Sequence, residues 1–150
     1  MPEQVGGAAF GAEGGLHDSA EVLTYPRRLL TIGRSLIDQG EPSIAVVVAH
    51  MACEVATERR LSEAFVTKGV QYLKDAVTGS FSGYSLRNNR IRGLYIALTG
   101  DKVQLTPFWS KFKNSAKRRN RIIHEGHTVG ATEAEESYKA ASDLLTHLKF

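Results

Sequence analysis

Apolar residues recur at alternating steps of three and four along most of this 150-residue chain, and this spacing constrains its fold more than any other feature. The first such stripe consists of Val22, Tyr25, Leu29, Ile32 and Leu36. No segment of the sequence alternates apolar and polar residues as a half-buried strand does, and no internal repeat is found. The sequence therefore predicts an all-α fold, a bundle of about five helices.

The amino-terminal part of the chain is expected to lie outside this bundle. Residues 1–17 hold five glycines and little else that can pack, so we predict a disordered tail there and a single helical domain over residues 18–150. Asp18, with Glu21 three residues later, has the spacing of a capping box. Pro26 falls inside the first stripe, so the helix either bends there or begins its regular part there.

A second, longer helix is predicted from about Pro42 to about Thr67. Its buried stripe is expected to consist of five apolar residues: Ile44, Val47, Val48, Met51 and Val55. Glu54 lies close to the same face, and His50 precedes it by one helical turn. A carboxylate that faces the interior is costly without a cation or a hydrogen-bond donor. Glu54 and His50 are therefore either a structural polar pair or support for an active site.

The middle of the chain is predicted to hold two more helices separated by a loop. A short helix follows Gly69, and residues 78–85 have the composition of a loop. Ser85 is the expected cap of the next helix, which ends at Gly100. The apolar face of that helix consists of Ile91, Leu94, Tyr95 and Leu98.

Two helices complete the predicted bundle. The first begins near Thr106, with Pro107 at its first position, and ends at Gly126. The last starts with a capping box formed by Thr132 and Glu135. Both keep the helical spacing of apolar residues, so both are expected to pack against the core.

Basic residues are concentrated in the first of these two helices. The net charge of +3 would say little if it were spread evenly, but six of the 19 Lys and Arg residues lie within positions 111–121, with no acidic residue among them. They are Lys111, Lys113, Lys117, Arg118, Arg119 and Arg121. A local basic field of this kind favours polyanions such as RNA, DNA or acidic lipid headgroups. We expect Lys117, Arg118 and Arg121 to attract nucleic-acid phosphates.

The composition indicates a globular protein of the cytoplasm. Hydrophobic and charged residues make up 42% and 23% of the chain, as in soluble proteins. Cys53 is the single cysteine, so no internal disulfide can form, and its apolar helical surroundings indicate a core residue rather than a nucleophile. No signal peptide is recognised, and the longest apolar run, Ile44–Ala49, is far too short to cross a bilayer. No membrane association is expected.

The end of the basic helix places an arginine, an asparagine and a histidine at helical spacing. Asn120 and His124 share a face, and the long side chain of Arg119 can reach the same phosphate. Gly126 ends the helix and leaves His124 in its last turn, where unpaired carbonyls favour the charged imidazole. These residue types suit transesterification by the RNA 2′-hydroxyl. His124 would act as acid or base, Arg119 would stabilise the phosphorane, and Asn120 would orient the histidine or hold the ribose or phosphate.

The run RRNRIIHEG resembles the Arg-polar-x-x-x-His signature of the HEPN superfamily, the higher eukaryote and prokaryote nucleotide-binding domains. The resemblance covers about residues 19–149, because that family is also an all-α bundle with a long, partly polar second helix. It implies that Arg119, Asn120 and His124 are the signature residues. More loosely, it implies that Glu54 is the acidic residue of the second helix that supports the motif.

The resemblance also implies an activity and partners. Family members are commonly metal-independent endoribonucleases that act as toxins or defence effectors. They usually form homodimers in which two motifs face one cleft, and a nucleotidyltransferase-like antitoxin often accompanies them. We therefore expect a homodimeric ribonuclease that binds RNA and needs no cofactor.

Two other functions fit the same residues. A catalytically inactive module would bind nucleic acid, a nucleotide or a partner protein through the basic face. In a structural dimerisation domain, His124 would only cap a helix and Arg119 would be a solvated charge. His17, His127 and His147 have no metal-ligand spacing, so no metal site is predicted. No glycine-rich phosphate loop points to hydrolysis of ATP or GTP.

Overall fold

The computed structural model describes residues 23–150, and every regular element within them is a helix. In chain order these are α1 (Tyr25–Asp38), α2 (Pro42–Thr67), η1 (Gln71–Leu73), α3 (Lys74–Thr78), α4 (Asn89–Thr99), η2 (Val103–Leu105), α5 (Trp109–Glu125) and α6 (Ala131–His147). The elements η1 and η2 are short 3₁₀ helices. The prediction of an all-α fold is confirmed. The predicted tail over residues 1–17 and the capping box at Asp18 lie outside the described residues.

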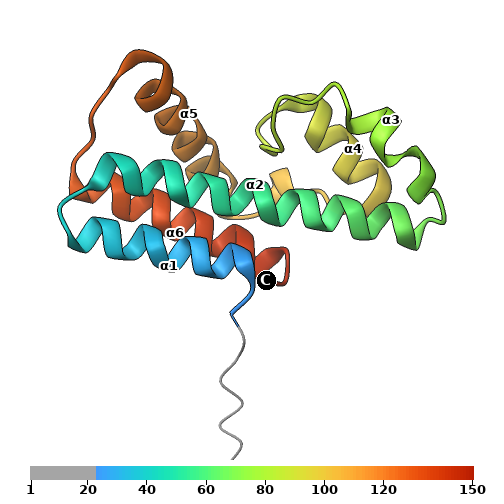
Figure 1. The fold of residues 1–150 in the computed structure, drawn as a ribbon, viewed down its shortest axis with the longest axis horizontal. Coiled ribbons are helices and arrows are strands. Elements are labelled where there is room, and N and C mark those ends of the chain that lie inside the picture. Colours follow the sequence, from blue (N-terminus) through green and yellow to red (C-terminus); the bar gives the residue numbers. More distant parts are fainter. Residues whose placement is uncertain (1–22) are drawn as a thin grey trace, which may run out of the picture.

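Helix α2 is the centre of the arrangement. It is 26 residues long and packs against α1, α4, α5 and α6. Figure 1 shows α1, α2 and α6 lying side by side along the molecule, with α5 and the α3–α4 segment placed separately on top of α2. Helix α6 also contacts α1 and α5. None of the helices within residues 23–150 is both long and apolar enough to cross a membrane.

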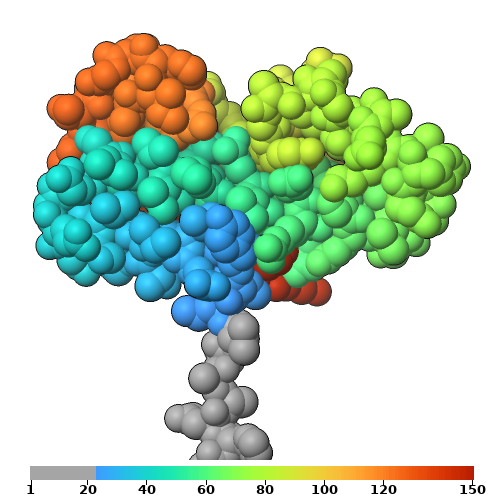
Figure 2. All heavy atoms as spheres, viewed as in Figure 1, coloured from blue at the N-terminus to red at the C-terminus, as the bar shows by residue number. Residues whose placement is uncertain are grey.

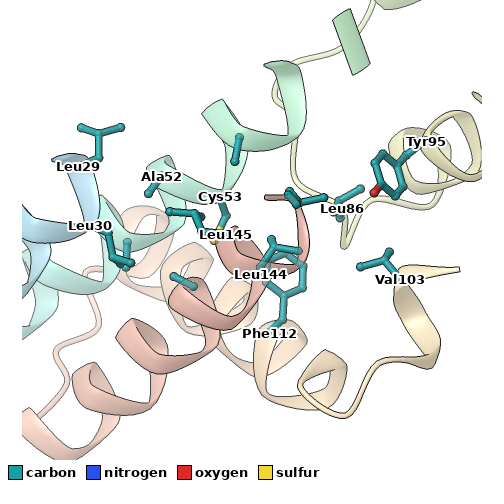
Figure 3. Packing of buried hydrophobic residues seen from close by; sticks show 14 of the residues in the cluster. Leu29, Leu30, Ala52, Cys53, Leu86, Tyr95, Val103, Phe112, Leu144 and Leu145 are labelled. Atoms are coloured by element: carbon teal, nitrogen blue, oxygen red, sulfur yellow. The ribbon is translucent and has the colours of Figure 1, made fainter. Parts of the chain in front are cut away.

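The main hydrophobic core lies where α2 meets α1, α5 and α6. Figure 3 shows part of it, with the labelled residues Leu29, Leu30, Ala52, Cys53, Leu86, Tyr95, Val103, Phe112, Leu144 and Leu145. Cys53 is buried here, and its burial raises the pKa of the thiol. The thiolate is therefore disfavoured, and the prediction that Cys53 is a core residue is confirmed.

The predicted bounds of α2 are confirmed, but its predicted buried stripe is wrong. Ile44 and Met51 are 50% and 42% exposed. The partly buried members of the stripe are Val47, Val48 and Val55. Between Pro42 and Ala56 the buried residues are mostly small: Ala45, Val46, Ala49, His50, Ala52, Cys53 and Ala56. Several helices surround α2, so burial is not confined to the side with the largest apolar residues.

Two predicted caps are replaced by neighbouring residues. Helix α4 is capped by Asn88, whose side-chain oxygen accepts hydrogen bonds from two backbone N–H groups of the first turn, so Ser85 is not its cap. Helix α6 begins after Gly130, which places Thr132 inside the helix without a capping hydrogen bond. Glu135 forms an ion pair with an arginine of α1 instead of a capping box. The two caps lie three residues later and two residues earlier than predicted.

Prolines and glycines mark several other helix ends. Helix α1 has Pro26 in its first turn, so the second of the two alternatives for this residue is confirmed. Helix α5 begins at Trp109, somewhat later than predicted, because Pro107 lies in the turn before it. Gly100 and Gly126 have φ values of 72° and 64° and end α4 and α5, as predicted.

Alanine substitutions at Gly126 and Gly93 test how much the left-handed backbone conformation of Gly126 contributes to stability. Gly126 has positive φ, whereas Gly93 lies inside α4, and a Cβ at either position would meet nothing within 4 Å. We expect Gly126→Ala to lower the free energy of unfolding by about 1 kcal/mol. Gly93→Ala should raise it by about 0.8 kcal/mol, because alanine is the better helix former. Urea denaturation measures both, and shifts of the same sign would contradict the role of Gly126.

Candidate functional site

A cleft of about 750 Å³ opens above the middle of α2. One wall is α5, the other is the segment over residues 80–92, and α2 contributes His50 and Glu54 to the base. Figure 2 shows this hollow between α5 and the segment that leads into α4. Its volume is within the range of small-molecule and cofactor sites in proteins.

Positive charge dominates the lining of the cleft. Among residues 23–150, six Lys and Arg side chains line it, against a single acidic one, Glu54. The six are Arg87, Arg90, Arg92, Lys113, Lys117 and Arg119. A cleft lined by one sign of charge concentrates ions of the opposite sign, and basic grooves are a common means of holding single-stranded nucleic acid. The cleft is therefore suited to phosphate groups.

The arginines of the second wall, Arg87, Arg90 and Arg92, are not among the predicted site residues. They lie between Asp75 and Asp101, a stretch of the sequence without any acidic residue. That acid-free stretch is the signal that points to them, because a local excess of positive charge indicates a surface for anions. The sequence does not show that this stretch lies opposite α5.

Two neighbours hold Arg119 at the base of the cleft. Its Nη1 donates a hydrogen bond to Asn120 Oδ1 at 3.0 Å, and its Nη2 lies 4.0 Å from Glu54 Oε2. The second contact is an ion pair that is too long for a hydrogen bond. The Nε atom is buried and has no partner among residues 23–150. The two Nη atoms carry four N–H bonds, of which the hydrogen bond to Asn120 uses one, so the guanidinium keeps donors that a ligand can use.

Glu54 connects α2 with both walls of the cleft. Burial raises the pKa of its carboxyl group, while the charge of Arg119 and the backbone of Tyr84 act in the opposite direction. The backbone at Gly83 comes so close that a Cβ there would lie 2.9 Å from Glu54 Oε1. The carboxylate is thus enclosed by the loop and held next to the guanidinium. The structure brings together four predicted site residues: Arg119, Asn120, Glu54 and Lys117.

His50 lies beside Glu54 and is almost fully buried. Its side chain is 3% exposed, and its ring stacks on Phe112 with 6.1 Å between the ring centroids. Burial, followed by the charges of Arg119 and Arg87, lowers the pKa of the imidazole from 6.5 to about 4. The ring is therefore neutral at pH 7, so its contact of 4.0 Å with Glu54 Oε1 is not an ion pair in the free protein.

His124 is separated from this group within one chain. It is exposed near the carboxyl end of α5 and is not among the described residues that line the cleft, whereas Arg119 and Asn120 are. Figure 1 shows that α5 slopes away from α2 toward this end. The arginine and asparagine of the predicted signature therefore lie in the cleft of one chain, and the histidine lies beyond it.

The predicted basic face is divided among several sides of α5, because successive residues point about 100° apart around a helix. Lys117 lines the cleft. Arg118 faces α6, where its Nη1 donates a hydrogen bond to Ser137 Oγ at 2.8 Å and its guanidinium pairs with two glutamates. Arg118 thus fastens α5 to α6, and its predicted contact with phosphate stays a prediction. Arg121 is exposed outside the cleft, 3.6 Å from Glu125.

No protein-family model, curated protein or solved structure matches this chain. Within residues 23–150, no three His, Cys, Asp or Glu side chains are grouped in a way that could hold a metal ion. The side chains of the cleft provide cations that can hold phosphates, a hydrogen-bonded arginine and asparagine, and a buried neutral histidine.

The burial of His50 predicts how stability depends on pH. The pKa of this imidazole falls from 6.5 to about 4 on folding, so the unfolded chain binds more protons between these two values. We expect this group alone to reduce the free energy of unfolding by about 3 kcal/mol as the pH falls through that window.

The matched variants are His50→Gln, which should lose this part of the pH dependence, and His127→Gln, which removes a histidine outside the cleft and should keep it. Chemical denaturation at a series of pH values measures the difference between each variant and the parent. Parallel profiles for His50→Gln and the parent would show that His50 is not buried in its neutral form.

Proposed function

We propose that the protein is a metal-independent endoribonuclease that cleaves RNA by transesterification through the 2′-hydroxyl. The observation that carries this proposal is the position of the hydrogen-bonded Arg119 and Asn120 in a cleft lined by six Lys and Arg side chains within residues 23–150. Phosphate contacts supply most of the sequence-independent affinity for nucleic acids. A guanidinium at the base of such a cleft is in a suitable position to stabilise charge on the phosphorane.

His124 is the proposed acid or base of the reaction. It lies one turn after Asn120, in the last turn of α5. Because it is exposed beyond the cleft, a second copy of the chain can approach it. We propose a homodimer in which Arg119, Asn120 and His124 of both chains form composite sites, as the resemblance to HEPN domains implies.

The biological setting is proposed from the same resemblance. Ribonucleases of the HEPN type commonly act as toxins or defence effectors, and a nucleotidyltransferase-like antitoxin is the partner that this setting implies. The protein would then act on RNA in the cytoplasm. Glu54 supports the proposed site through its ion pair with Arg119 rather than by touching the substrate.

A second candidate function is a nucleic-acid- or nucleotide-binding module without catalytic activity. It is favoured by the separation of His124 from the cleft, because the groups suited to binding phosphate lie inside while the proposed acid or base lies outside. This module would bind through the same cations and would leave RNA intact.

Cleavage of mixed RNA in the presence of EDTA distinguishes the two functions. We expect the parent protein to cleave RNA despite chelation, and His124→Ala to slow cleavage by about 10²- to 10⁴-fold, the usual contribution of a general acid or base. Arg119→Ala should also slow it, because charge on the phosphorane loses its guanidinium partner. The control is His127→Ala, which removes a partly exposed imidazole of the same region. If His124→Ala cuts as fast as the parent, the mechanism is wrong.

Salt dependence tests whether the cleft binds RNA. With single-stranded RNA and a His124→Ala background, we expect Lys113→Ala to reduce the slope of log affinity against log salt by about 0.7, the value for one lost phosphate contact. Lys139→Ala is the control, because Lys139 is highly exposed on α6 and pairs with Asp143 outside this cleft. Fluorescence anisotropy measures both slopes. Equal slopes would place the RNA elsewhere, and no affinity at moderate salt would favour a purely structural domain.

A further inference from the structure

The base of the cleft contains two buried polar atoms that lack partners. Residues 23–150 hold four buried side-chain nitrogen or oxygen atoms without a hydrogen bond, and two of them are His50 Nδ1 and Arg119 Nε. Both residues line the cleft. Buried polar groups are almost always paired, so an unpaired group at the base of a cavity indicates a ligand that completes it. The two atoms belong to α2 and α5, which both line this cleft.

The surroundings of His50 favour an anion. Arg119 faces it from α5 and Arg87 from the segment before α4, and both charges act on the imidazole. Glu54, on its own helix, is the acidic group that faces it, with 4.0 Å between His50 Nε2 and Glu54 Oε1. Lys113 and Lys117 line the same cleft from α5. Positive charge is therefore in excess around the ring.

We propose that His50 is a phosphate-binding residue at the base of the cleft, where it takes a proton from solvent as a phosphate group enters between Arg87 and Arg119. This inference deepens the proposed function, since it rests on RNA as the natural source of the phosphate. It adds two residues, His50 and Arg87, that the Arg-Asn-His signature does not contain. The only covalent change is the new N–H bond of the imidazole, whose proton comes from water or buffer.

The electrostatics of the site explain why His50 would take up a proton when phosphate binds. In the free protein, burial and two nearby guanidinium groups keep the imidazole neutral. A bound phosphate anion lowers the positive potential at the ring, and a charged hydrogen bond from imidazolium to phosphate is stronger than one from a neutral ring. Glu54 can also pair with the charged ring, because the two groups lie within ion-pair distance. A histidine that only packs against Phe112 would show no such response.

NMR titration of the His50 ring tests the proposal with sulfate as the probe. Sulfate keeps both charges across the working pH range, so it contributes no protons of its own, and a chloride series at equal ionic strength is the control. The pKa of His50 should be about 4 without sulfate and should rise by at least one pH unit at saturating sulfate. A rise of about two units would make sulfate bind about tenfold more tightly at pH 5 than at pH 7. Absence of sulfate binding, or binding with an unchanged titration of His50, overturns the proposal.

Matched variants separate His50 from the other cations. His50→Gln keeps a hydrogen-bond donor but cannot titrate, so its sulfate affinity should lose the pH dependence, whereas His127→Gln should keep it. If His50→Gln does not fold, the titration of the parent protein decides alone. Two 2′-deoxydinucleotides, with and without a 5′-phosphate, then distinguish a terminal phosphate from an internal one, since neither can be cleaved through a 2′-hydroxyl.

The test is independent of RNA cleavage. If His124→Ala cuts RNA as fast as the parent while sulfate still raises the pKa of His50, the proposed ribonuclease mechanism fails and the phosphate site stands. If cleavage requires His124 but sulfate does not raise the pKa of His50, the phosphate site at His50 fails and the proposed ribonuclease mechanism stands.

Discussion

The close packing of α2 against its neighbours is the constraint on which the candidate site depends. Ala45 and Ala49 present so little side chain that the backbone of α1 comes close at Gly33, where an added Cβ would lie 3.6 Å from the Ala45 carbonyl oxygen. This close contact holds α2 in a position in which His50 and Glu54 lie beneath α5, with side chains that are 3% and 21% exposed. Packing on one side of α2 thus affects the protonation of groups on the other side, because burial raises the pKa of the Glu54 carboxyl and lowers that of the His50 imidazole.

In the part of the chain that the structure describes, the basic side chains between α5 and α6 are paired with acidic partners, whereas most of those that line the cleft are not. On the side of α5 that faces α6, Arg118 and Lys111 both pair with Glu136. Among the residues between 23 and 150 that line the cleft, Glu54 is the only acidic one, and its carboxylate lies 4.0 Å from the Arg119 guanidinium. The charge next to α6 is neutralised within the protein, whereas the charge in the cleft exceeds what one carboxylate can balance. An anionic ligand would supply the missing negative charge.

Local chemistry explains which parts of the fold could be predicted. Pro42 and Gly126 have backbone preferences of their own, so the start of α2 and the end of α5 follow from the residues at those positions. The buried side of α2 could not be predicted from periodicity, because it depends on how many helices surround it. The same applies to the site. Arg119 and Asn120 are neighbours in sequence, but Arg87 reaches the cleft only through tertiary packing. Helical spacing alone also does not tell which side of α5 packs against α6, and Arg118 lies on that side.

The two walls of the cleft differ in how firmly they are anchored. Helix α5 packs on both α2 and α6, and Arg118 adds ion pairs to the second contact, whereas α4 packs mainly on α2 and is preceded by an irregular segment. A change in the width of the cleft would therefore arise from the wall that carries Arg87, with the wall that carries Arg119 staying in place. Ligands of different bulk would be accommodated by adjustment of a loop backbone, while the guanidinium nearest the proposed scissile bond keeps a constant position.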